Sequence, residues 1–346
     1  MHGHTLFQSA VKGSLPKKIP FWLMRQAGRY LPEYQATRKE AGGFLKLALT
    51  PKLATEVTLQ PIRRFDMDAA IIFSDILIPP YALGMDLRYE EGEGPKMTPL
   101  TSGAEIKNLD LNGYRAKLEP VYEALSEARR LLPKDKSLIG FAGAPFTVAL
   151  YMLEGGGSND YSRAKQFMFT QKREMDELIQ ILISVTTDYL YHQVKAGADV
   201  VKLFDSWAGL LPEPYYSEWV IRPARHIVRN LRSHYPDLPI ICFPRGSGAS
   251  YKKFARDVMP SMIAIDQTVD PLWAKAELQP ICTVQGNLDP LLLVAGGEEM
   301  EKNIAFILQS LEKGPFVFNL GHGVLKYTKP EHVLKLSEQI KAFSRG

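Results

Sequence analysis

Charged side chains stand where several apolar runs of the sequence end. Arg25 and Arg29 follow the run "PFWL" at a spacing of four, which would place both on one helical face, and Arg245 follows the run "PIICFP". A guanidinium group is always charged and binds a carboxylate through two parallel hydrogen bonds. Solvated surface arginines are the alternative. The position at the ends of apolar runs favours a clamp for a small molecule with several negative charges.

Asp75 and His322 stand at the ends of two other apolar runs. Asp75 is one carboxylate inside "AAIIFSDILIPP", and burying a charge is costly unless it is paired or hydrogen-bonded. It is either a helix cap or ion-pair partner, or a carboxylate that waits for hydrogen-bond donors on a ligand. His322 lies between two glycines, which let the backbone bend sharply. It is either a turn residue or a hydrogen-bonding group, and its neighbours do not indicate a metal site.

A phenol and a hydroxyl follow two further runs. In "GFAGAPFTVALYMLEGGGS", Thr147 can cap a helix and Tyr151 falls one turn later on the same face. Tyr151 is then close to a strand end, unless it is only a packed aromatic residue. Ser206 in "KLFDSWAG" is favoured as a hydrogen-bond donor over a nucleophile, which needs an adjacent base. Polar residues at the other run ends are Asp205, Asp266, Gln285 and Asn287.

The elements that must position these residues alternate between short apolar runs and helical stretches. Such runs are typical of buried parallel strands, and stretches with a period near 3.6, such as "YRAKLEPVYEALSEARRLL", lie between most of them. The expected strands are residues 21–24, 69–73, 137–141, 200–204, 239–243, 262–265, 281–285 and 316–319. This order predicts an α/β fold, a single distorted (β/α)8 TIM-type barrel with its functional residues at the carboxyl ends of the strands. A doubly wound sheet is the alternative, but GxGxxG is absent after the first run.

Turn residues and overall composition indicate the domain organisation and the class of protein. Residues 86–111 read as a short hairpin insertion after the second expected strand, and no linker divides residues 1–346, so we expect one domain. The 346 residues are 45% hydrophobic with a formal net charge of +4, and without a long basic block we expect no nucleic-acid partner. No secretory signal or membrane-spanning run is evident, so we expect a cytoplasmic protein with no membrane partner. Cys242 and Cys282 lie in apolar segments and are expected to be buried thiols.

Two long segments carry a family resemblance. "PFWLMRQAGRYLPEYQATR" and "GFAGAPFTVALYMLEGGGS" resemble the signature segments of the uroporphyrinogen decarboxylase family, and "FSDIL", "KLFDSWAG", "CFPRG", "QGNLDP" and "FNLGHGV" are similar to its other blocks in the same order. The resemblance covers nearly the whole chain. It implies a distorted barrel that forms a homodimer and removes CO2 from the four acetate side chains of uroporphyrinogen III. The product is coproporphyrinogen III in haem biosynthesis, and neither a metal nor an organic cofactor is implied.

The resemblance also implies roles for single residues. The carboxylate-binding pair is matched by Arg25 and Arg29, and the central aspartate by Asp75. The remaining matches are to a tyrosine, a serine, a histidine and an apolar residue that frames the macrocycle, here Tyr151, Ser206, His322 and Phe141. All seven are expected to bind substrate, and the expected catalytic residues are Asp75, Arg25, Tyr151 and His322.

The sequence departs from the family pattern at a few positions. Members often have Trp where Phe146 stands and an aromatic residue where Gln267 stands, and a Pro/Asp-rich run is common where this chain has Lys326 and Lys329. These changes concern local packing and the rim of the site rather than the reaction.

The implied reaction needs an electron sink, because loss of CO2 from an arylacetate leaves a carbanion. A pyrrole protonated at a ring carbon next to nitrogen accepts those electrons, and a fixed carboxylate such as Asp75 stabilises the cation. The proton donor stays open between Arg25, His322 and a water held by either, although a guanidinium with a pKa above about 12 is a poor acid. The rival functions are a corrinoid-dependent methyltransferase with a thiolate–histidine zinc site and a non-catalytic tetrapyrrole-binding protein.

Overall fold

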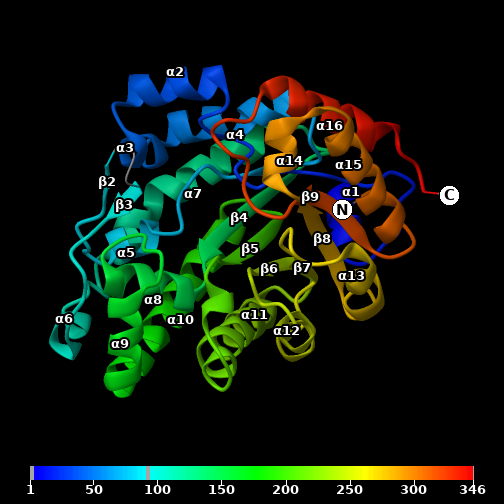
Figure 1. The fold of residues 1–346 in the computed structure, drawn as a ribbon. Helices are drawn as coiled ribbons and strands as arrows, with labels where there is room; N and C mark the ends of the chain where they lie inside the picture. Colours follow the sequence, from blue (N-terminus) through cyan, green and yellow to red (C-terminus); the bar gives the residue numbers. More distant parts are fainter. Residues whose placement is uncertain (1–3, 91–93, 346) are drawn as a thin grey trace.

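A parallel sheet of seven strands forms the centre of the computed structural model, which describes residues 4–90 and 94–345. The strands pair in the order β1-β4-β5-β6-β7-β8-β9, and Figure 1 shows the sheet curled inside a layer of helices. Because all seven strands are parallel, their carboxyl ends lie at one end of the sheet. The strand bounds are β1 Ala69–Ile71, β4 Ser137–Gly143, β5 Val200–Asp205, β6 Ile240–Pro244, β7 Met262–Ala264, β8 Thr283–Leu288 and β9 Phe316–Leu320.

The segment 21–24, expected as the first strand, lies between β9 and β1 but forms only one bridge. Phe21 pairs in parallel with Phe318 of β9, and its carbonyl accepts a hydrogen bond of 3.0 Å from the backbone N–H of Asp68 just before β1. The N–H of Met24 bonds to a side chain at 3.0 Å instead of to a neighbouring strand. The expected strand is therefore wrong beyond Phe21, because side chains replace the ladder partners.

The other seven expected strands lie within a few residues of observed ones. The largest difference is β8, which continues to Leu288. Gln285 and Asn287, expected after a strand end, lie inside this strand and are buried. The amide of Asn287 donates to the carbonyls of Asp266 and Val269 at 2.9 and 2.7 Å, so it holds a neighbouring loop.

Helices cover the outside of the sheet. The longest, α10, begins at Lys172, two residues after the end of α9, so two helices occupy the stretch before Gly197. Several of these helices contact the parallel sheet directly, and burying an apolar face in this way is the usual reason that such helices form in a large fold. The helix bounds are α1 Leu6–Val11, α2 Pro32–Ala41, α3 Phe44–Ala48, α4 Pro51–Phe65, α5 Ile78–Ala82, α6 Gly103–Lys107, α7 Tyr114–Leu131, α8 Pro145–Glu154, α9 Ser162–Thr170, α10 Lys172–Lys195, α11 Arg222–His234, α12 Ser250–Val258, α13 Pro271–Glu277, α14 Pro290–Ala295, α15 Gly297–Leu311 and α16 Pro330–Ala342.

The short helix α1 contacts the amino-terminal end of the sheet. The hydroxyl of Thr5, its N-cap, lies 2.5 Å from the hydroxyl of Ser137, the first residue of β4. The hydroxyl of Thr283, the first residue of β8, donates to the carbonyl of Ala10 at 2.9 Å. The opposite, carboxyl end of the sheet carries the loops that hold the expected site residues; we call this end the mouth.

A second, two-stranded sheet follows α5. β2 (Arg88–Glu90) and β3 (Gly94–Lys96) pair antiparallel, with Tyr89 opposite Pro95. Residues 91–93 between them lie outside the described residues. These strands therefore stand apart from the parallel sheet.

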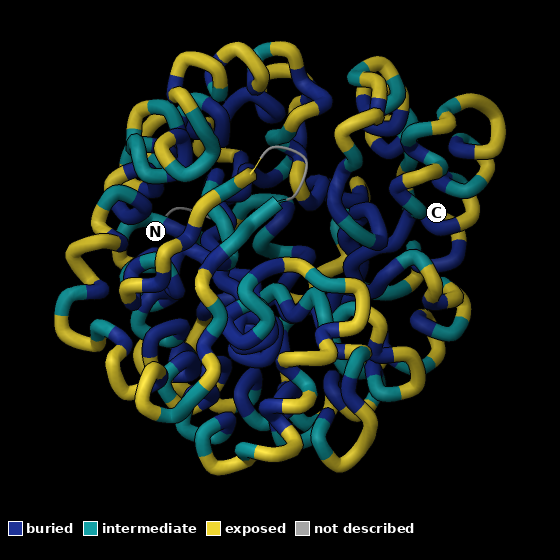
Figure 2. Tube along the Cα trace, turned by 60° about the vertical axis from the view of Figure 1, so that its left-hand side comes forward, coloured by how far each residue is buried: buried dark blue, intermediate teal, exposed yellow. Residues whose placement is uncertain are grey.

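Burial follows the layers of the fold. In Figure 2 the buried stretches gather in the interior, and the exposed stretches lie mostly on the outer helices and loops. Six of the parallel strands, β1, β4, β6, β7, β8 and β9, are buried along their whole length, as expected for strands with both faces covered. Among the helices of the described residues, none is long and apolar enough to cross a bilayer.

Candidate functional site

Arg25 and Arg29 lie on an irregular turn, not on a helix. This arginine turn, residues 24–30, precedes α2, and Arg25 has a left-handed backbone with φ 60°. Such a conformation costs a non-glycine residue on the order of 1–3 kcal/mol and is often found at functional sites. The buried side chain of Gln26 holds the turn, because its amide bonds to the backbone of Leu23 and Ala69, both at 3.1 Å. The expected shared helical face is therefore wrong.

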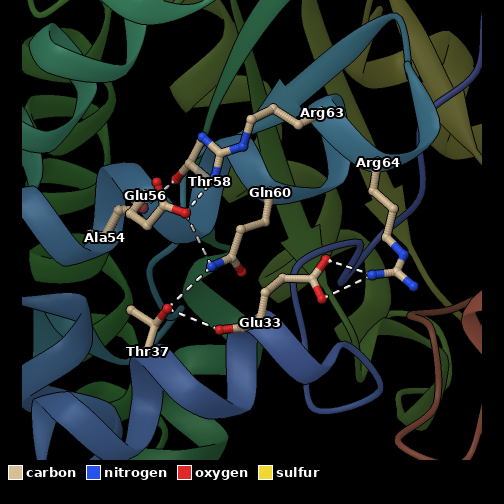
Figure 3. A network of polar contacts seen from close by, with 8 residues as sticks. All are labelled: Glu33, Thr37, Ala54, Glu56, Thr58, Gln60, Arg63 and Arg64. Carbon is tan, nitrogen blue, oxygen red and sulfur yellow. Dashed lines mark hydrogen bonds and ion pairs between the residues drawn. The ribbon is translucent and has the colours of Figure 1, made fainter.

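A polar network fastens α2, which follows the arginine turn, to α4. Figure 3 shows Gln60 of α4 donating to Thr37 of α2 at 3.2 Å and to Glu56 at 3.4 Å. Arg64 of α4 makes two hydrogen bonds, of 3.1 and 3.2 Å, to the carboxylate of Glu33. Because exposed ion pairs contribute little, the buried Gln60–Thr37 bond is the stronger constraint. The network places the end of the turn against α4.

The same helix also positions the segment that carries Asp75. The hydroxyl of Thr58 in α4 accepts a hydrogen bond of 2.9 Å from the backbone N–H of Phe73, two residues before Asp75. Asp75 follows β1 at the mouth and is partly exposed, and one of its oxygens accepts the N–H of Leu77 at 2.8 Å. The local turn therefore occupies Oδ1 of Asp75 and makes no bond to Oδ2.

Opposing influences act on the Asp75 carboxyl. Burial is the largest and raises the pKa above its ordinary value. The Leu77 N–H, the Tyr89 hydroxyl and the Arg25 charge, in that order, lower the pKa. Asp75 and Arg25 are therefore close enough to interact across the mouth.

Two tyrosines lie near Asp75. Tyr89 reaches it from β2, and the electrostatic influence of Tyr151 on Tyr89 puts Tyr151, on α8, in the same neighbourhood. The hydroxyl of Tyr151 accepts a hydrogen bond of 3.3 Å from the indole N–H of Trp207. Sequence reasoning missed Tyr89, because a lone tyrosine in a polar hairpin carries no signal of its partners.

His322 lies on the loop after β9, where the charge of Arg25 also acts on it. Burial lowers the pKa of the imidazole to about 3, with further lowering by the charges of Arg25 and Arg245. The ring is therefore neutral at neutral pH in the free protein. Its Nδ1 is buried and, within the described part of the chain, has no hydrogen-bond partner. The side chain of Arg25 also lies against Gly323, where a Cβ would overlap it.

The segment after β5 holds Ser206 beside a buried carboxyl. Asp205 accepts a hydrogen bond of 2.5 Å from the hydroxyl of Thr147, which itself accepts the N–H of Trp207 at 3.1 Å. Thr147 therefore ties α8 to β5. The N-cap of α8 is Ala144, so the expectation that Thr147 caps this helix is wrong. Burial raises the pKa of Asp205 to about 7. Ser206 itself is partly exposed at the mouth.

Not all the expected residues share contacts with Asp75. Arg29 is exposed on the arginine turn, and its charge acts on the pKa of Tyr34 rather than on Asp75 or His322. Phe141 lies inside β4, with its ring 5.5 Å from that of Phe204. The structure thus groups Asp75, Arg25 and His322 most closely. Asp266, another expected strand-end residue, is buried and accepts hydrogen bonds from Gly246, Tyr251 and Thr268.

Two hollows lie away from this group, on the outer helices. One of about 660 Å³ is lined by α7 and α10 residues, and one of about 460 Å³ by α10 and α11 residues. Neither contains a residue of the mouth. Their positions on the outer layer separate them from the strand ends where the charged residues gather.

The two cysteines are not part of a possible metal-binding cluster in the described residues. Cys242 lies on β6 and Cys282 just before β8, and neither forms a disulfide. Burial raises the pKa of each thiol to about 12. Over residues 4–90 and 94–345, no group of three or more His, Cys, Asp or Glu side chains is placed to hold a metal ion.

Comparison with known proteins covers nearly the whole chain. A family model described as uroporphyrinogen decarboxylase (URO-D) matches residues 3–343. The chain is 50% identical over 336 residues to the uroporphyrinogen decarboxylase of Rhodospirillum rubrum, covering 97% of both chains. It is 47% identical over 334 residues to that of Rhodobacter capsulatus, covering 96% of this chain and 97% of the relative.

Solved structures extend the similarity of fold. A methyltransferase from Methanosarcina mazei superposes with a TM-score of 0.77 at 17% identity, covering 97% of both chains. A B12-independent methionine synthase from Shewanella superposes with a TM-score of 0.56 at 10% identity, covering 95% of this chain and 94% of the other. At such low identity these matches concern the fold alone.

Proposed function

The chain belongs to the uroporphyrinogen decarboxylase family, and we propose that it removes CO2 from the four acetate side chains of uroporphyrinogen III to give coproporphyrinogen III. It is thus a carboxy-lyase of porphyrin and haem biosynthesis. The observation that carries this proposal is the grouping of Asp75, Arg25 and His322 at the mouth of a chain that is 50% identical to such an enzyme over 336 residues.

Asp75 is proposed to accept hydrogen bonds from the pyrrole N–H groups and to balance positive charge in the transition state. Protonation of one pyrrole at a ring carbon next to nitrogen makes a cation that accepts the electrons released with CO2. A carboxylate fixed before the reaction stabilises this cation without reorganising. The pyrrole donors would also lower the raised pKa of Asp75, since hydrogen bonds to a carboxylate favour its ionised form.

The substrate carboxylates need donors around the mouth. We propose that Arg25 and Arg29 bind the acetate or propionate arms, and that Tyr151, Ser206 and His322 donate further hydrogen bonds. Phe141 is proposed to contact the face of the macrocycle. The exposure of both arginines leaves their donors available to a ligand.

The neutral imidazole bears on the choice of proton donor. With a pKa of about 3, His322 in the free protein holds too few protons to donate one at neutral pH. Arg25 also releases a proton reluctantly. We therefore propose that both groups position the reacting arm, and that a water held beside them delivers the proton.

The rival functions fit the observations less well. The likeness to a methyltransferase at 17% identity concerns the fold, and among the described residues neither Cys242 nor Cys282 belongs to a group of three or more possible metal ligands. A non-catalytic carrier would not need a carboxylate between a guanidinium and a phenol. Decarboxylation is therefore the function favoured here.

The architecture and setting of the enzyme complete the proposal. We infer that the bridge at Phe21 stands in for an eighth strand, giving a distorted (β/α)8 barrel in which β2 and β3 form a hairpin insertion. We propose that residues 1–346 act as one domain. As in the family pattern, we propose a cytoplasmic homodimer without metal or organic cofactor and without nucleic-acid or membrane partners.

Asp75→Asn tests the proposed function directly. We expect turnover to fall by at least about 100-fold, the usual effect of removing one preorganised electrostatic partner of a transition state. Purified enzyme would be supplied with uroporphyrinogen III under anaerobic conditions, and the products would be counted by carboxyl number after oxidation to porphyrins.

Asp257→Asn is the matched control, because it makes the same chemical change on the outer helix α12. Circular dichroism and thermal melting would verify that both variants fold. Near-wild-type decarboxylation by Asp75→Asn would remove the central role of this carboxylate. No release of CO2 by the unmodified chain would refute the proposed function itself.

A further inference from the structure

The hydroxyl of Tyr89 is a buried donor without an aligned partner. It is enclosed by protein, and within the described residues it makes no hydrogen bond of normal geometry. It nevertheless lies close enough to the Asp75 carboxylate to influence its pKa. Leaving such a group unpaired costs on the order of 1–3 kcal/mol, so its placement beside a carboxylate calls for a role.

Aromatic packing holds the Tyr89 ring in place. The ring centroid lies 4.5 Å from that of Phe44 on α3, and Phe44 in turn lies 5.5 Å from Phe73. Phe73 is two residues before Asp75, so one aromatic row connects the phenol to the segment that carries the carboxylate. The pairing of Tyr89 with Pro95 between β2 and β3 also holds the backbone of Tyr89 in place. The Tyr89 hydroxyl is thereby held beside the Asp75 carboxyl.

The charged and titratable groups around Asp75 come from several elements. Arg25 approaches from the arginine turn, Tyr89 from β2 and Tyr189 from α10, and Tyr151 of α8 acts through Tyr89. Among these, Arg25 is also expected to bind substrate. Tyr89 is the phenol that lowers the pKa of this carboxyl directly.

We propose that Tyr89 is a positioning residue for decarboxylation, whose hydroxyl donates a hydrogen bond to Asp75 and holds the carboxylate charged and aimed into the mouth. The activity part of this inference rests on the proposed function. The β2–β3 strands thereby contribute to the site through Asp75, rather than through a contact with substrate.

The sign of the expected pH effect follows from this role. A hydrogen bond to the ionised form lowers the pKa of a carboxyl group, and here it works against burial. Removing the hydroxyl therefore raises the pKa of Asp75, and a larger fraction of the enzyme holds the inactive, protonated form at mildly acidic pH. Well above both pKa values the carboxylate is ionised with or without Tyr89.

Tyr89→Phe tests the inference, since it removes the hydroxyl and keeps the ring. The acid limb of kcat/KM, which reports the free enzyme, is expected to move to higher pH by about half to one unit, the effect of losing one hydrogen bond to a carboxylate. Tyr122→Phe is the matched control, because it also removes a buried phenolic hydroxyl that has no hydrogen-bond partner among the described residues, on α7, and Tyr122 is not among the groups that act on Asp75. Its pH profile is expected to match that of the wild type.

A second measurement needs no activity. The side-chain carboxyl resonance of Asp75 in 13C-aspartate-labelled protein, assigned by its loss in Asp75→Asn, is expected to titrate at higher pH in Tyr89→Phe than in wild type. An unchanged acid limb and resonance, equal shifts in both phenylalanine variants, or a uniform fall in turnover at every pH would overturn the inference. Absence of decarboxylation by the wild type would instead count against the proposed function, and the titration would still decide on Tyr89.

Discussion

Lys202 on β5 has an amine without an ion-pair partner in the interior of the described structure. Its side chain is fully buried, and its Nζ has no hydrogen-bond partner among the described residues. Three rings, those of Trp22, Phe204 and Phe243, have centroids 4.7 to 5.2 Å from Nζ. Cation–π attraction is worth about 2 kcal/mol when desolvated. Burial nevertheless dominates and lowers the pKa of Lys202 well below its ordinary value.

At the residue scale, Lys202→Met is expected to stabilise the protein. Methionine keeps the length of the side chain and removes a buried, unpaired amine that costs on the order of 1–3 kcal/mol. Because the folded-state pKa is lowered, the unfolded chain binds a proton that the folded chain does not, at pH values between the two pKa values. Wild-type stability therefore rises with pH up to about 10, the ordinary lysine pKa, and the gain from Lys202→Met shrinks over that range.

Urea unfolding at pH 7, 8.5 and 10 would measure this change in free energy of unfolding. Lys39→Met, on the exposed face of α2, is the control and is expected to change stability little at any of these pH values. A destabilised Lys202→Met protein, or a gain independent of pH, would contradict the argument.

At the element scale, the loop between β9 and α16 and the arginine turn support each other. The N–H of Val324 donates to the carbonyl of Met24 at 2.8 Å, and the side chain of Arg25 lies against Gly323. The small size of Gly323 is therefore needed for close approach, because its Cβ position is occupied by the arginine. His322 on the same loop is held at this contact.

Gly323→Ala is expected to displace Arg25 and to raise the KM for uroporphyrinogen by about tenfold, equivalent to about 1.4 kcal/mol. A smaller effect on kcat is expected if the arginine binds ground state and transition state alike. Steady-state kinetics would measure both constants. Gly157→Ala is the control, because its Cβ would meet no atom within 4 Å. An unchanged KM in Gly323→Ala would show that the position of Arg25 does not depend on this contact.

At the scale of the whole molecule, Asp68 connects the amino-terminal segment to the sheet. Its side chain accepts the N–H of Phe21 at 2.9 Å, and its backbone N–H donates to the carbonyl of the same residue at 3.0 Å. Its carbonyl also accepts the N–H of Ser137 at the start of β4. One residue thus joins the segment between β9 and β1 to two strands, with the arginine turn three residues beyond Phe21.

Asp68→Ala is expected to lower the free energy of unfolding by about 1–3 kcal/mol, because it leaves the buried N–H of Phe21 without its charged acceptor. Amide hydrogen exchange is expected to speed up over residues 21–26 and in β9. Asp135→Ala, an exposed aspartate in the turn before β4, is the control for loss of a carboxylate. Equal exchange in the two variants would refute this role of Asp68.

The sequence predicted the elements of this fold well where the signal was local. Apolar runs bounded by polar or turn residues located seven strands, and helical periodicity located α7. Long-range hydrogen bonds account for the main misses. The segment 21–24 has the local pattern of a strand. In the folded chain, however, its backbone N–H groups at Phe21 and Met24 bond to side chains about 45 and 300 residues away instead of to a neighbouring strand.

By itself, the sequence determined the family, the order of strands and helices, and the position of Asp75 and His322 after two buried strands. These properties follow from residue type and local pattern. Tertiary structure decided the left-handed turn that aims Arg25, the neutral state of His322 and the approach of Tyr89 to Asp75. The physical reason is that backbone strain, burial and electrostatic neighbours depend on segments that meet only when the chain is folded.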